Sequence, residues 1–388
     1  MSKQATPQRK DDNPGNEKAL YVALELSLKT WKLAISDGSR NRPRVISIDA
    51  KDWKAFEDEL KRARKRLELP ESTAIRSCYE AGREGFWVHR ALMRMGIENV
   101  IVDAASMEVN RRRKQVKTDR VDAEKLVHDL MRYWTGDRGV WSVVRVPTEE
   151  VEDGRQLHRD LGTLQSEAHA HRLRIQSLLF TQGVDVKVGR KFLQQLEPLR
   201  RWDGQPIKES LRQRLEREYQ RLQLAEAMMA ELRQKQKQML KADKTPAIEK
   251  ARRLQQLGGI GMRSSWVFSM ECFGWRKFRN RREVGAAFGM VGVPHQSGQT
   301  DHEQGISRAG NKTMRAMAIE IAWAWLRLQP QSELSRWFKR RFAGGGARMR
   351  KIGIVGLGRR LMIALWRYLE TGIPPQGARL KAAAPIAP

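Results

Sequence analysis

The stretch Tyr21-Val-Ala-Leu-Glu-Leu-Ser-Leu-Lys-Thr-Trp-Lys-Leu-Ala-Ile35 consists of two mainly apolar runs joined tightly around Ser27 to Thr30. This pattern predicts two strands of a hairpin. The residues that follow, up to Pro147, alternate between strand-like and helix-like patterns, which predicts a mixed-sheet α/β domain. We expect strands near 20–26, 31–36, 43–49, 73–79, 98–102 and 140–146, and helices near 51–66, 86–95 and 119–133.

Two hairpin-like strands followed by alternating strand and helix are the order of a ribonuclease-H-like domain, which we place at residues 19–147. Beyond it, long helices are expected near 150–182 and 207–241. The second helix carries an apolar stripe interrupted by Glu218 and Gln236. Its members are Leu211, Leu215, Leu222, Ala225, Met229, Leu232 and Met239. The stripe predicts a coiled-coil seam in a helical connector, residues 148–246, or alternatively a helix hairpin packed within one chain.

The last large segment, residues 247–373, is expected to be a mainly helical domain with glycine-rich joints. The predicted fold class is therefore α/β plus all-α. The stretch Gln256-Leu-Gly-Gly-Ile-Gly261 predicts a joint between helices, either a phosphate-holding turn or a simple tight turn. Residues 1–18 and 374–388 are expected to be tails, the first of them disordered because of its Pro, Asn and charge content.

Four carboxylates occupy positions that suit one metal site. Glu25 lies in the first predicted strand, and Glu80 follows a strand at its carboxyl end, where open α/β sheets usually build their sites. Asp119 and Asp122 begin a predicted helix at i,i+3 spacing, which places both on one face of its first turn. Carboxylate oxygens suit Mg²⁺. The alternative for the two aspartates is a favourable interaction with the helix dipole alone.

The composition points to a nucleic-acid partner. Lys and Arg number 74 against 45 Asp and Glu, a formal net charge of +29, which attracts polyanions. No apolar run approaches the ~18 residues of a membrane span, and the first residues are polar, so we expect no membrane contact and a cytoplasmic protein. Cys78 and Cys272 are expected to be buried free thiols, and His169 and His171 to be surface residues.

Three groups of basic residues are candidates for phosphate binding. The first precedes the paired aspartates, the second surrounds Ser307, and the third falls in residues 339–360, where frequent glycines predict a mobile basic loop. Solvated charged surface is the alternative for each. The candidates are Arg111, Arg112, Arg113, Lys114 and Lys117; Arg308, Lys312 and Arg315; and Arg340, Arg341, Arg348, Arg350 and Lys351.

Two blocks of sequence resemble a known family. Lys117-Thr-Asp-Arg-Val-Asp-Ala123 resembles the Lys-Thr-Asp-x-x-Asp-Ala motif of transposases of the insertion-sequence 110 group, relatives of the pilin-gene inversion recombinase. Val291-Gly-Val-Pro-His-Gln-Ser-Gly298 and Gly305-Ile-Ser-Arg-Ala-Gly-Asn-Lys-Thr-Met-Arg315 resemble that family's Ser-Gly element and its Ile-Ser-Lys-x-Gly-Asn-x-x-Leu-Arg signature. The resemblance spans about residues 20–370.

The resemblance implies a RuvC-like catalytic domain, a coiled-coil connector and a carboxy-terminal transposase domain with a nucleophilic serine. It also implies a DNA recombinase that binds donor and target DNA, with some members guided by a structured bridge RNA, and a dimer or tetramer formed through the coiled coil. The family's acids correspond to Glu25, Glu80, Asp119 and Asp122, and its serine to Ser297. Glu25 departs from the family, which has Asp there.

The implied chemistry is attack by Ser297 on a phosphodiester, with Mg²⁺ held by the four carboxylates. Ser297 is expected in a loop. Ser307 is the alternative nucleophile, and could instead cap the helix expected from Lys312 or contact a phosphate. Two other functions remain open: a metal-dependent hydrolytic nuclease or junction resolvase, and a nucleic-acid-binding homologue impaired by the longer Glu25 side chain.

Overall fold

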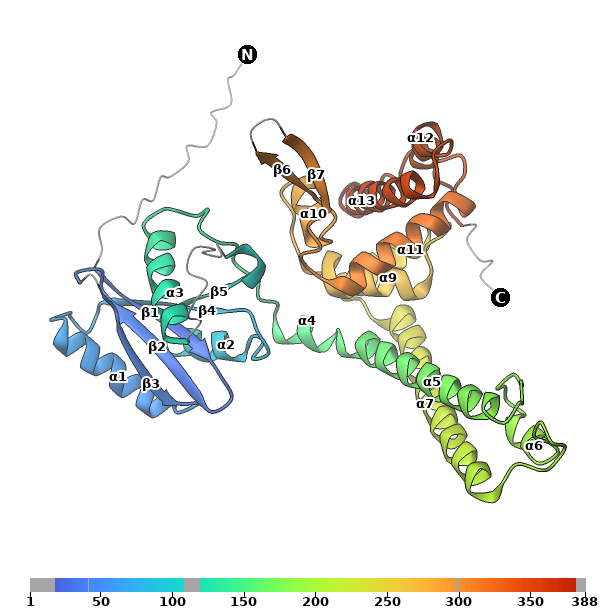
Figure 1. Cartoon of the computed structure of the whole chain (residues 1–388). Helices are drawn as coiled ribbons and strands as arrows, with labels where there is room; N and C mark the ends of the chain where they lie inside the picture. Colours follow the sequence, from blue (N-terminus) through green and yellow to red (C-terminus); the bar gives the residue numbers. More distant parts are fainter. Residues whose placement is uncertain (1–17, 41, 108–118, 298–299, 382–388) are drawn as a thin grey trace, which may run out of the picture. The chain divides into compact units, whose positions relative to one another are not determined.

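The computed structural model describes residues 18–40, 42–107, 119–297 and 300–381 (Figure 1). It divides into two compact units, Met1–Val146 and Pro147–Pro388. The expected amino-terminal tail and the basic run at 111–117 lie outside the described residues.

A five-stranded mixed sheet forms the centre of the first unit. Its strand order is β3-β2-β1-β4-β5. β2 pairs antiparallel with β1 and β3, whereas β4 pairs parallel with β1 and β5. The bounds are β1 (Ala19–Leu26), β2 (Thr30–Ser36), β3 (Arg44–Asp49), β4 (Ala74–Glu80) and β5 (Glu98–Val102). These five strands were predicted. The sixth, expected near 140–146, is wrong, because that segment makes only an isolated antiparallel bridge between Val143 and Val102.

Helices cover both faces of this sheet. One face packs its buried side chains with α1 (Trp53–Arg66) and α2 (Trp87–Arg94). The other packs against α3 (Asp119–Trp134), whose position the sequence predicted closely. Strand alternation explains the division, because successive side chains of a strand point to opposite faces. The α1/α2 face receives Leu20, Val22 and Leu24 of β1, and the α3 face receives Ala19, Tyr21 and Ala23. A short 3₁₀ helix (Ala104–Ser106) follows β5.

A pair of long helices dominates the amino-terminal part of the second unit. α5 (Gln156–Phe180) and α7 (Glu209–Ala242) run side by side (Figure 1). The apolar stripe of α7 packs against α5 of the same chain, with Leu215 and Leu222 among buried residues that include Ile175 and Leu179. The helix-hairpin alternative therefore describes this contact, and an inter-chain coiled coil stays a prediction. α4 (Glu149–Asp153) precedes α5, and α6 (Phe192–Leu196) lies in the connection to α7.

The carboxy-terminal part of the second unit is helical around an apolar core that includes Phe268, Trp325 and Leu361. Its helices are α8 (Pro246–Gln255), α9 (Met262–Phe268), a π-helix (Ser269–Phe273), α10 (Arg281–Ala287), α11 (Lys312–Leu328), α12 (Glu333–Phe342) and α13 (Ala347–Thr371). The joint at 256–261 does link two helices, α8 and α9.

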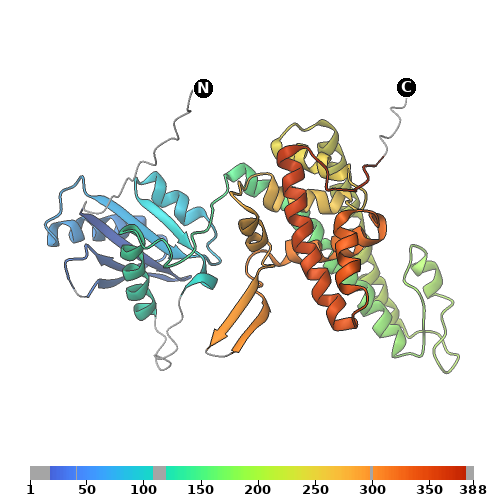
Figure 2. The same ribbon diagram turned by 90° about the horizontal axis from the view of Figure 1, so that it is seen from above.

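A β-hairpin interrupts the helices of the second unit. β6 (Gly292–Ser297) and β7 (Thr300–Ile306) pair antiparallel and extend beyond α10 (Figure 2). The loop expected around Ser297 is therefore wrong, because Ser297 ends a strand. The mobile basic loop expected at 339–360 is also wrong: those residues belong to α12 and α13, with a short turn at Gly344 to Gly346 between them.

Cys78 and Cys272 are buried free thiols, as predicted. In the described part of the chain, every helix is too short or too polar to cross a membrane.

Candidate functional site

Glu25 and Glu80 lie on the same face of the sheet. Glu25 continues the alternation of Tyr21 and Ala23, which pack on the α3 face. In β4, Cys78 packs on that face as well, and Glu80 lies two residues further along. Because strand side chains alternate with a period of two, both carboxylates belong to the α3 face. Glu25 is half-buried and Glu80 is exposed.

The register of the two strands aligns these carboxylates. Leu24 and Tyr79 are partners in the parallel pairing of β1 with β4, and Glu25 and Glu80 are the next residues. Neighbouring strands lie about 4.8 Å apart, so the two side chains start from adjacent points at the carboxyl ends of their strands. On the other side of β1, Lys32 is the register partner of Glu25.

Helix α3 brings a third carboxylate to this end of the sheet. Cys78 Sγ lies 3.8 Å from the carbonyl oxygen of Leu126, which fixes the middle of α3 over the middle of β4. Met131, further along the helix, lies near Gly38, which follows β2 at the opposite end of the sheet. The helix therefore runs so that Asp122, one turn before Leu126, lies toward the end that carries Glu25 and Glu80.

Asp122 is half-buried beside the buried Ala123. The backbone of Asp119 begins α3, as predicted, and its side chain lies outside the description. Among the described side chains, no group of three or more His, Cys, Asp or Glu is already arranged to hold a metal ion. The backbone nevertheless directs three of the four predicted acids to one end of the α3 face.

The two candidate serines lie at opposite ends of the β6–β7 hairpin. Ser297 ends β6 and is the register partner of Thr300 at the tip, so it lies on a strand rather than in the expected loop. Nothing is described of its side chain. Ser307 follows β7 at the base, where it is exposed and its N–H donates to the carbonyl of Val291 at 2.8 Å. At ~3.3 Å per strand residue, the two are separated by roughly 20 Å.

The signature block around Ser307 has a structural explanation. Gly310 adopts φ of +78° and packs so closely that an added Cβ would lie 2.7 Å from the carbonyl oxygen of Ala287. Asn311 is the N-cap of α11, and its side-chain oxygen accepts from the N–H groups of Thr313 and Met314. Ser307 is therefore not the cap of this helix, which corrects one of its predicted alternatives.

Three basic residues of this block, Arg308, Lys312 and Arg315, were predicted to bind phosphate. The structure gives Arg315 a contact with the backbone and Arg308 an unusual backbone conformation. Arg315 donates through one nitrogen to the carbonyl oxygens of Arg308 and Ala309, at 2.9 and 3.2 Å, and so holds the loop. Arg308 has φ of +55°, a left-handed conformation that is uncommon for a residue with a side chain. Lys312 is exposed at the start of α11.

The third basic group lies on helices. Arg340 on α12 pairs with Glu333 at 2.6 Å, and Arg350 on α13 donates to the carbonyl of Ala343 at 3.3 Å. The others predicted there, Arg341, Arg348 and Lys351, are exposed. All five residues belong to the two helices on either side of the short turn between α12 and α13, and not to a closing loop.

Sequence reasoning missed a buried ionic cluster around Glu271. This carboxylate lies in the π-helix and is 6% exposed. It accepts from His158 Nε2 at 2.9 Å and from Arg159 Nε and Nη2 at 2.9 and 3.2 Å. Arg155 Nε lies 3.8 Å away, with its guanidinium over the ring of Trp275. Burial raises the pKa of Glu271, but the hydrogen bonds from His158 and Arg159 outweigh it and lower that pKa to about 2.

A second cluster lies between α5 and α7. Glu218 is buried and accepts from His171 Nδ1 at 2.7 Å and from Arg174 at 2.9 Å. Burial raises the pKa of Glu218, but these hydrogen bonds outweigh it, and the pKa lies below its usual value. His171 is therefore part of a helix-to-helix contact and not the surface residue that was expected. The sequence feature that could have indicated this contact is Glu218, an acidic residue within the apolar stripe of α7.

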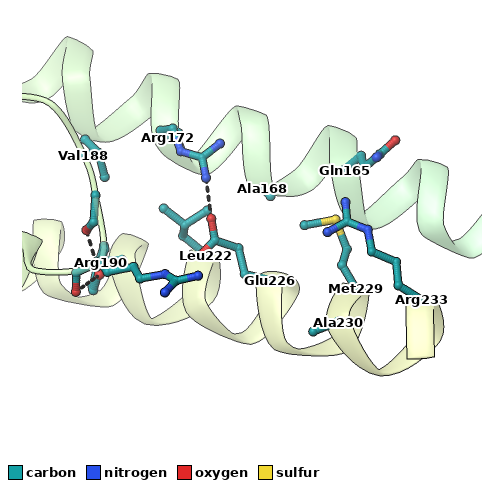
Figure 3. A pocket seen from close by; sticks show the side chains of 12 residues that line it. Gln165, Ala168, Arg172, Val188, Arg190, Leu222, Glu226, Met229, Ala230 and Arg233 are labelled. Atoms are coloured by element: carbon teal, nitrogen blue, oxygen red, sulfur yellow. Dashed lines mark hydrogen bonds and ion pairs between the residues drawn. The ribbon is translucent and has the colours of Figure 1, made fainter. Parts of the chain in front are cut away.

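Two cavities flank the α5–α7 pair. The first, of about 610 Å³, is lined by residues of both helices; Arg172 and Glu226 form an ion pair across it (Figure 3). The second, of about 530 Å³, is lined by α5, α7, α9, the π-helix and the start of α11, and includes Glu271. Gln165 and Arg233 line both cavities.

Comparison with known proteins identifies relatives of this chain. The model of the IS116/IS110/IS902 transposase family matches residues 251–335. The predicted transposase y4rJ of Sinorhizobium fredii strain NGR234 is 37% identical over 378 residues, which cover 94% of this chain and 95% of the relative. The transposase for insertion sequence element IS1533 of Leptospira borgpetersenii is 28% identical over 177 residues, 45% of this chain and 48% of the relative.

These matches define the class as insertion-sequence transposases. The chain belongs to the IS116/IS110/IS902 family, which confirms the resemblance predicted from its motifs. The matched residues 251–335 include the π-helix, the β6–β7 hairpin and the Gly305–Arg315 block.

Proposed function

We propose that this transposase cuts and rejoins DNA through Ser297, assisted by Mg²⁺ bound to Glu25, Glu80, Asp119 and Asp122. In the cutting step, Ser297 Oγ forms a bond to phosphorus while the bond from phosphorus to the leaving sugar oxygen breaks. The serine proton passes to a base and the leaving oxygen gains a proton. The covalent phosphoserine conserves the bond for rejoining to a second DNA end.

The alignment of Glu25 with Glu80 is the observation that carries the metal proposal. Two carboxylates at neighbouring strand ends, with Asp122 directed to the same end, provide the hard oxygen ligands that Mg²⁺ prefers. When bound, Mg²⁺ would lower the cost of deprotonating the nucleophile and neutralise charge on the phosphate. The strand order β3-β2-β1-β4-β5, with helices on both faces, supports a ribonuclease-H-like, RuvC-like domain for this unit.

Basic residues and the α5–α7 pair would bind the nucleic acids and form the oligomer in this proposal. The net charge of +29 supports binding of donor and target DNA and of a guiding bridge RNA. Basic residues that remain exposed, among them Arg341 and Arg348, would contact phosphates. A dimer or tetramer would be formed by the exposed sides of α5 and α7, since their facing sides already pack within one chain.

The test is a covalent adduct assay. Protein, Mg²⁺, guide RNA and end-labelled DNA are incubated, and denaturing gels then separate protein–DNA adducts from free nicked strands. The proposal expects an adduct in the parent protein and none in Ser297→Ala. Asp122→Asn should also abolish the adduct, whereas Glu124→Gln on the same helix should keep it, because Glu124 forms a surface pair with Arg120. Nicked DNA without an adduct would indicate a hydrolytic nuclease, and binding without cleavage an impaired homologue.

A further inference from the structure

The 530 Å³ cavity between the α5–α7 pair and the carboxy-terminal helices has the features of a ligand site. We propose that it receives one unstacked nucleotide of a single-stranded nucleic acid, with the base against its apolar wall and the phosphate toward its arginines. Its volume is within the range of about 300–1,000 Å³ that small-molecule pockets occupy. The proposal does not depend on Ser297 or on the carboxylates of the first unit.

Gln236 is the residue that we assign to the edge of the base. It lies on α7, is 3% exposed and lines the cavity. No side-chain hydrogen bond joins its amide to another of the residues that the structure describes. The amide is therefore available to a ligand in the cavity. An amide offers two N–H donors and one carbonyl acceptor, which is the combination that pairs with the edge of a nucleobase.

Arginines make the cavity suited to an anion. Arg233 and Arg263 are exposed residues of its lining. Arg159 is fixed beside it by the two hydrogen bonds to Glu271, the one acid among the lining residues. Three guanidinium groups against one carboxylate leave an excess of positive charge. A phosphate group fits this charge, since guanidinium binds it bidentately.

Part of the remaining wall is apolar, and the rest carries polar residues such as Thr163 and Asn311. Val267 and Met317 are each 4% exposed, and Met262 adds a second thioether. Methionine sulfur makes favourable contacts with aromatic rings and adapts to irregular shapes. A cavity with an apolar part, a buried amide and a cationic side therefore has a complement for each part of a nucleotide.

The ligand is assigned to a single strand because a base in a duplex has its pairing edge occupied and its faces stacked. An unstacked base exposes both. The adjoining 610 Å³ cavity shares Arg233 and adds Arg172 of α5 and Arg190 of the connection between α5 and α7 (Figure 3). Along α5, Arg159 and Arg172 are separated by about 20 Å at ~1.5 Å per residue. Neighbouring phosphates of the strand can follow these arginines while one base turns inward.

The first test measures binding without cleavage. Labelled single-stranded DNA, single-stranded RNA and duplex DNA are titrated by fluorescence anisotropy in EDTA, on the Ser297→Ala protein. Gln236→Leu should weaken single-strand binding about tenfold, the scale of one base-edge contact, and leave duplex binding unchanged. Gln238→Leu is the matched control, an exposed glutamine two residues away. Arg233→Gln should weaken binding and flatten its salt dependence more than the exposed Lys237→Gln.

The second test locates the base directly. RNA carrying 4-thiouridine, DNA carrying 4-thiothymidine and free 4-thiouridine monophosphate are photo-crosslinked, and the modified peptides are mapped. Crosslinks to Met262 or Met317 that Gln236→Leu removes support the proposal, and the reactive probe identifies an RNA, a DNA or a free nucleotide as ligand. Crosslinks only elsewhere would overturn it. The proposal would also be overturned by a Gln236→Leu protein that is more stable than the parent and binds single strands equally well. The amide would then be a buried polar group that contacts only water and no ligand. Gln236→Glu, nearly isosteric, covers the case in which Gln236→Leu fails to fold.

Discussion

Leu24 and Tyr79 are register partners in the parallel pairing of β1 with β4, and this pair aligns the two glutamates that follow them. A shift of the register by one residue would place Glu25 and Glu80 diagonally instead of side by side. It would also turn the other face of one strand toward α3. Strand pairing in the first unit therefore determines where the two carboxylates of the proposed metal site start from the backbone.

Glu80→Gln should abolish DNA cleavage while leaving nucleic-acid affinity within about tenfold, because a neutral amide cannot replace an anionic metal ligand. Glu98→Gln is the control, since Glu98 belongs to the next strand and pairs with Arg76 at 3.1 Å. Cleavage is followed on labelled DNA over a Mg²⁺ titration. A Glu80→Gln protein with parental activity at every Mg²⁺ concentration would remove Glu80 from the site.

Glu25→Asp gives this chain the family's residue at that position. We expect equal or higher cleavage, because the shorter side chain restores the reach for which the family's site is built. The measurement is the cleavage rate at saturating Mg²⁺, with affinity for DNA as the control. A large loss would show that the neighbourhood of Glu25, including its register partner Lys32, is adapted to the longer side chain.

Ser297 and Ser307 can be separated by their positions on the hairpin. Ser297→Ala removes one oxygen at the tip, so folding and nucleic-acid binding should persist while adduct and recombinant product disappear. Ser307→Ala at the base should leave the adduct. The reverse pattern would assign the nucleophile to Ser307, roughly 20 Å away. Cleavage by both variants would rule out a serine nucleophile and favour water.

The strands of the first unit could be predicted because their alternation and their apolar length are local properties of the sequence. The β6–β7 hairpin could not. β6 contains Pro294, His295 and Gln296, and β7 contains Asp301, His302 and Glu303, so no hydrophobic alternation marks the two strands. The segment near 140–146 shows the opposite error, because valines suggested a strand where only one bridge forms.

Glycines misled the prediction for α13. Gly353 was interpreted as part of a loop, yet it lies inside a 25-residue helix. An added Cβ there would lie 2.5 Å from Cγ of Phe342, so the glycine permits close packing of α12 on α13. The cluster at Glu271 was beyond local reasoning for another reason: its partners His158 and Arg159 are 113 and 112 residues distant in sequence.

Gly289 should be among the glycines least tolerant of substitution. It has φ of +61°, and an added Cβ would lie 1.9 Å from the carbonyl oxygen of Ala309. Gly305 is the control, with φ of +99° and no atom within 4 Å of the added Cβ. Backbone strain alone costs roughly 1–3 kcal/mol, so Gly305→Ala should lose about that much and Gly289→Ala distinctly more in thermal or chemical unfolding. Equal losses would mean that the contact with Ala309 relaxes freely.

Glu271 gives a prediction with a defined pH range. Its pKa is lowered from 4.5 to about 2 in the folded chain, so its ionisation stabilises the folded state above the unfolded pKa and the effect is lost as pH falls toward 2. Glu271→Gln should lower the free energy of unfolding by about 3 kcal/mol at neutral pH, from ~1.4 kcal/mol per pKa unit. It leaves Arg155, Arg159 and His158 without their common anion.

The difference between parent and Glu271→Gln should be constant from neutral pH to about pH 5 and shrink progressively from there to about pH 2. Denaturant unfolding at several pH values, followed by the fluorescence of tryptophans such as Trp275 beside Arg155, measures it. Glu333→Gln is the control, because Glu333 is exposed in its pairs with Arg336 and Arg340 and should change little. A difference of the same size at pH 2 and at pH 7 would assign the loss to packing of the side chain rather than to its charge.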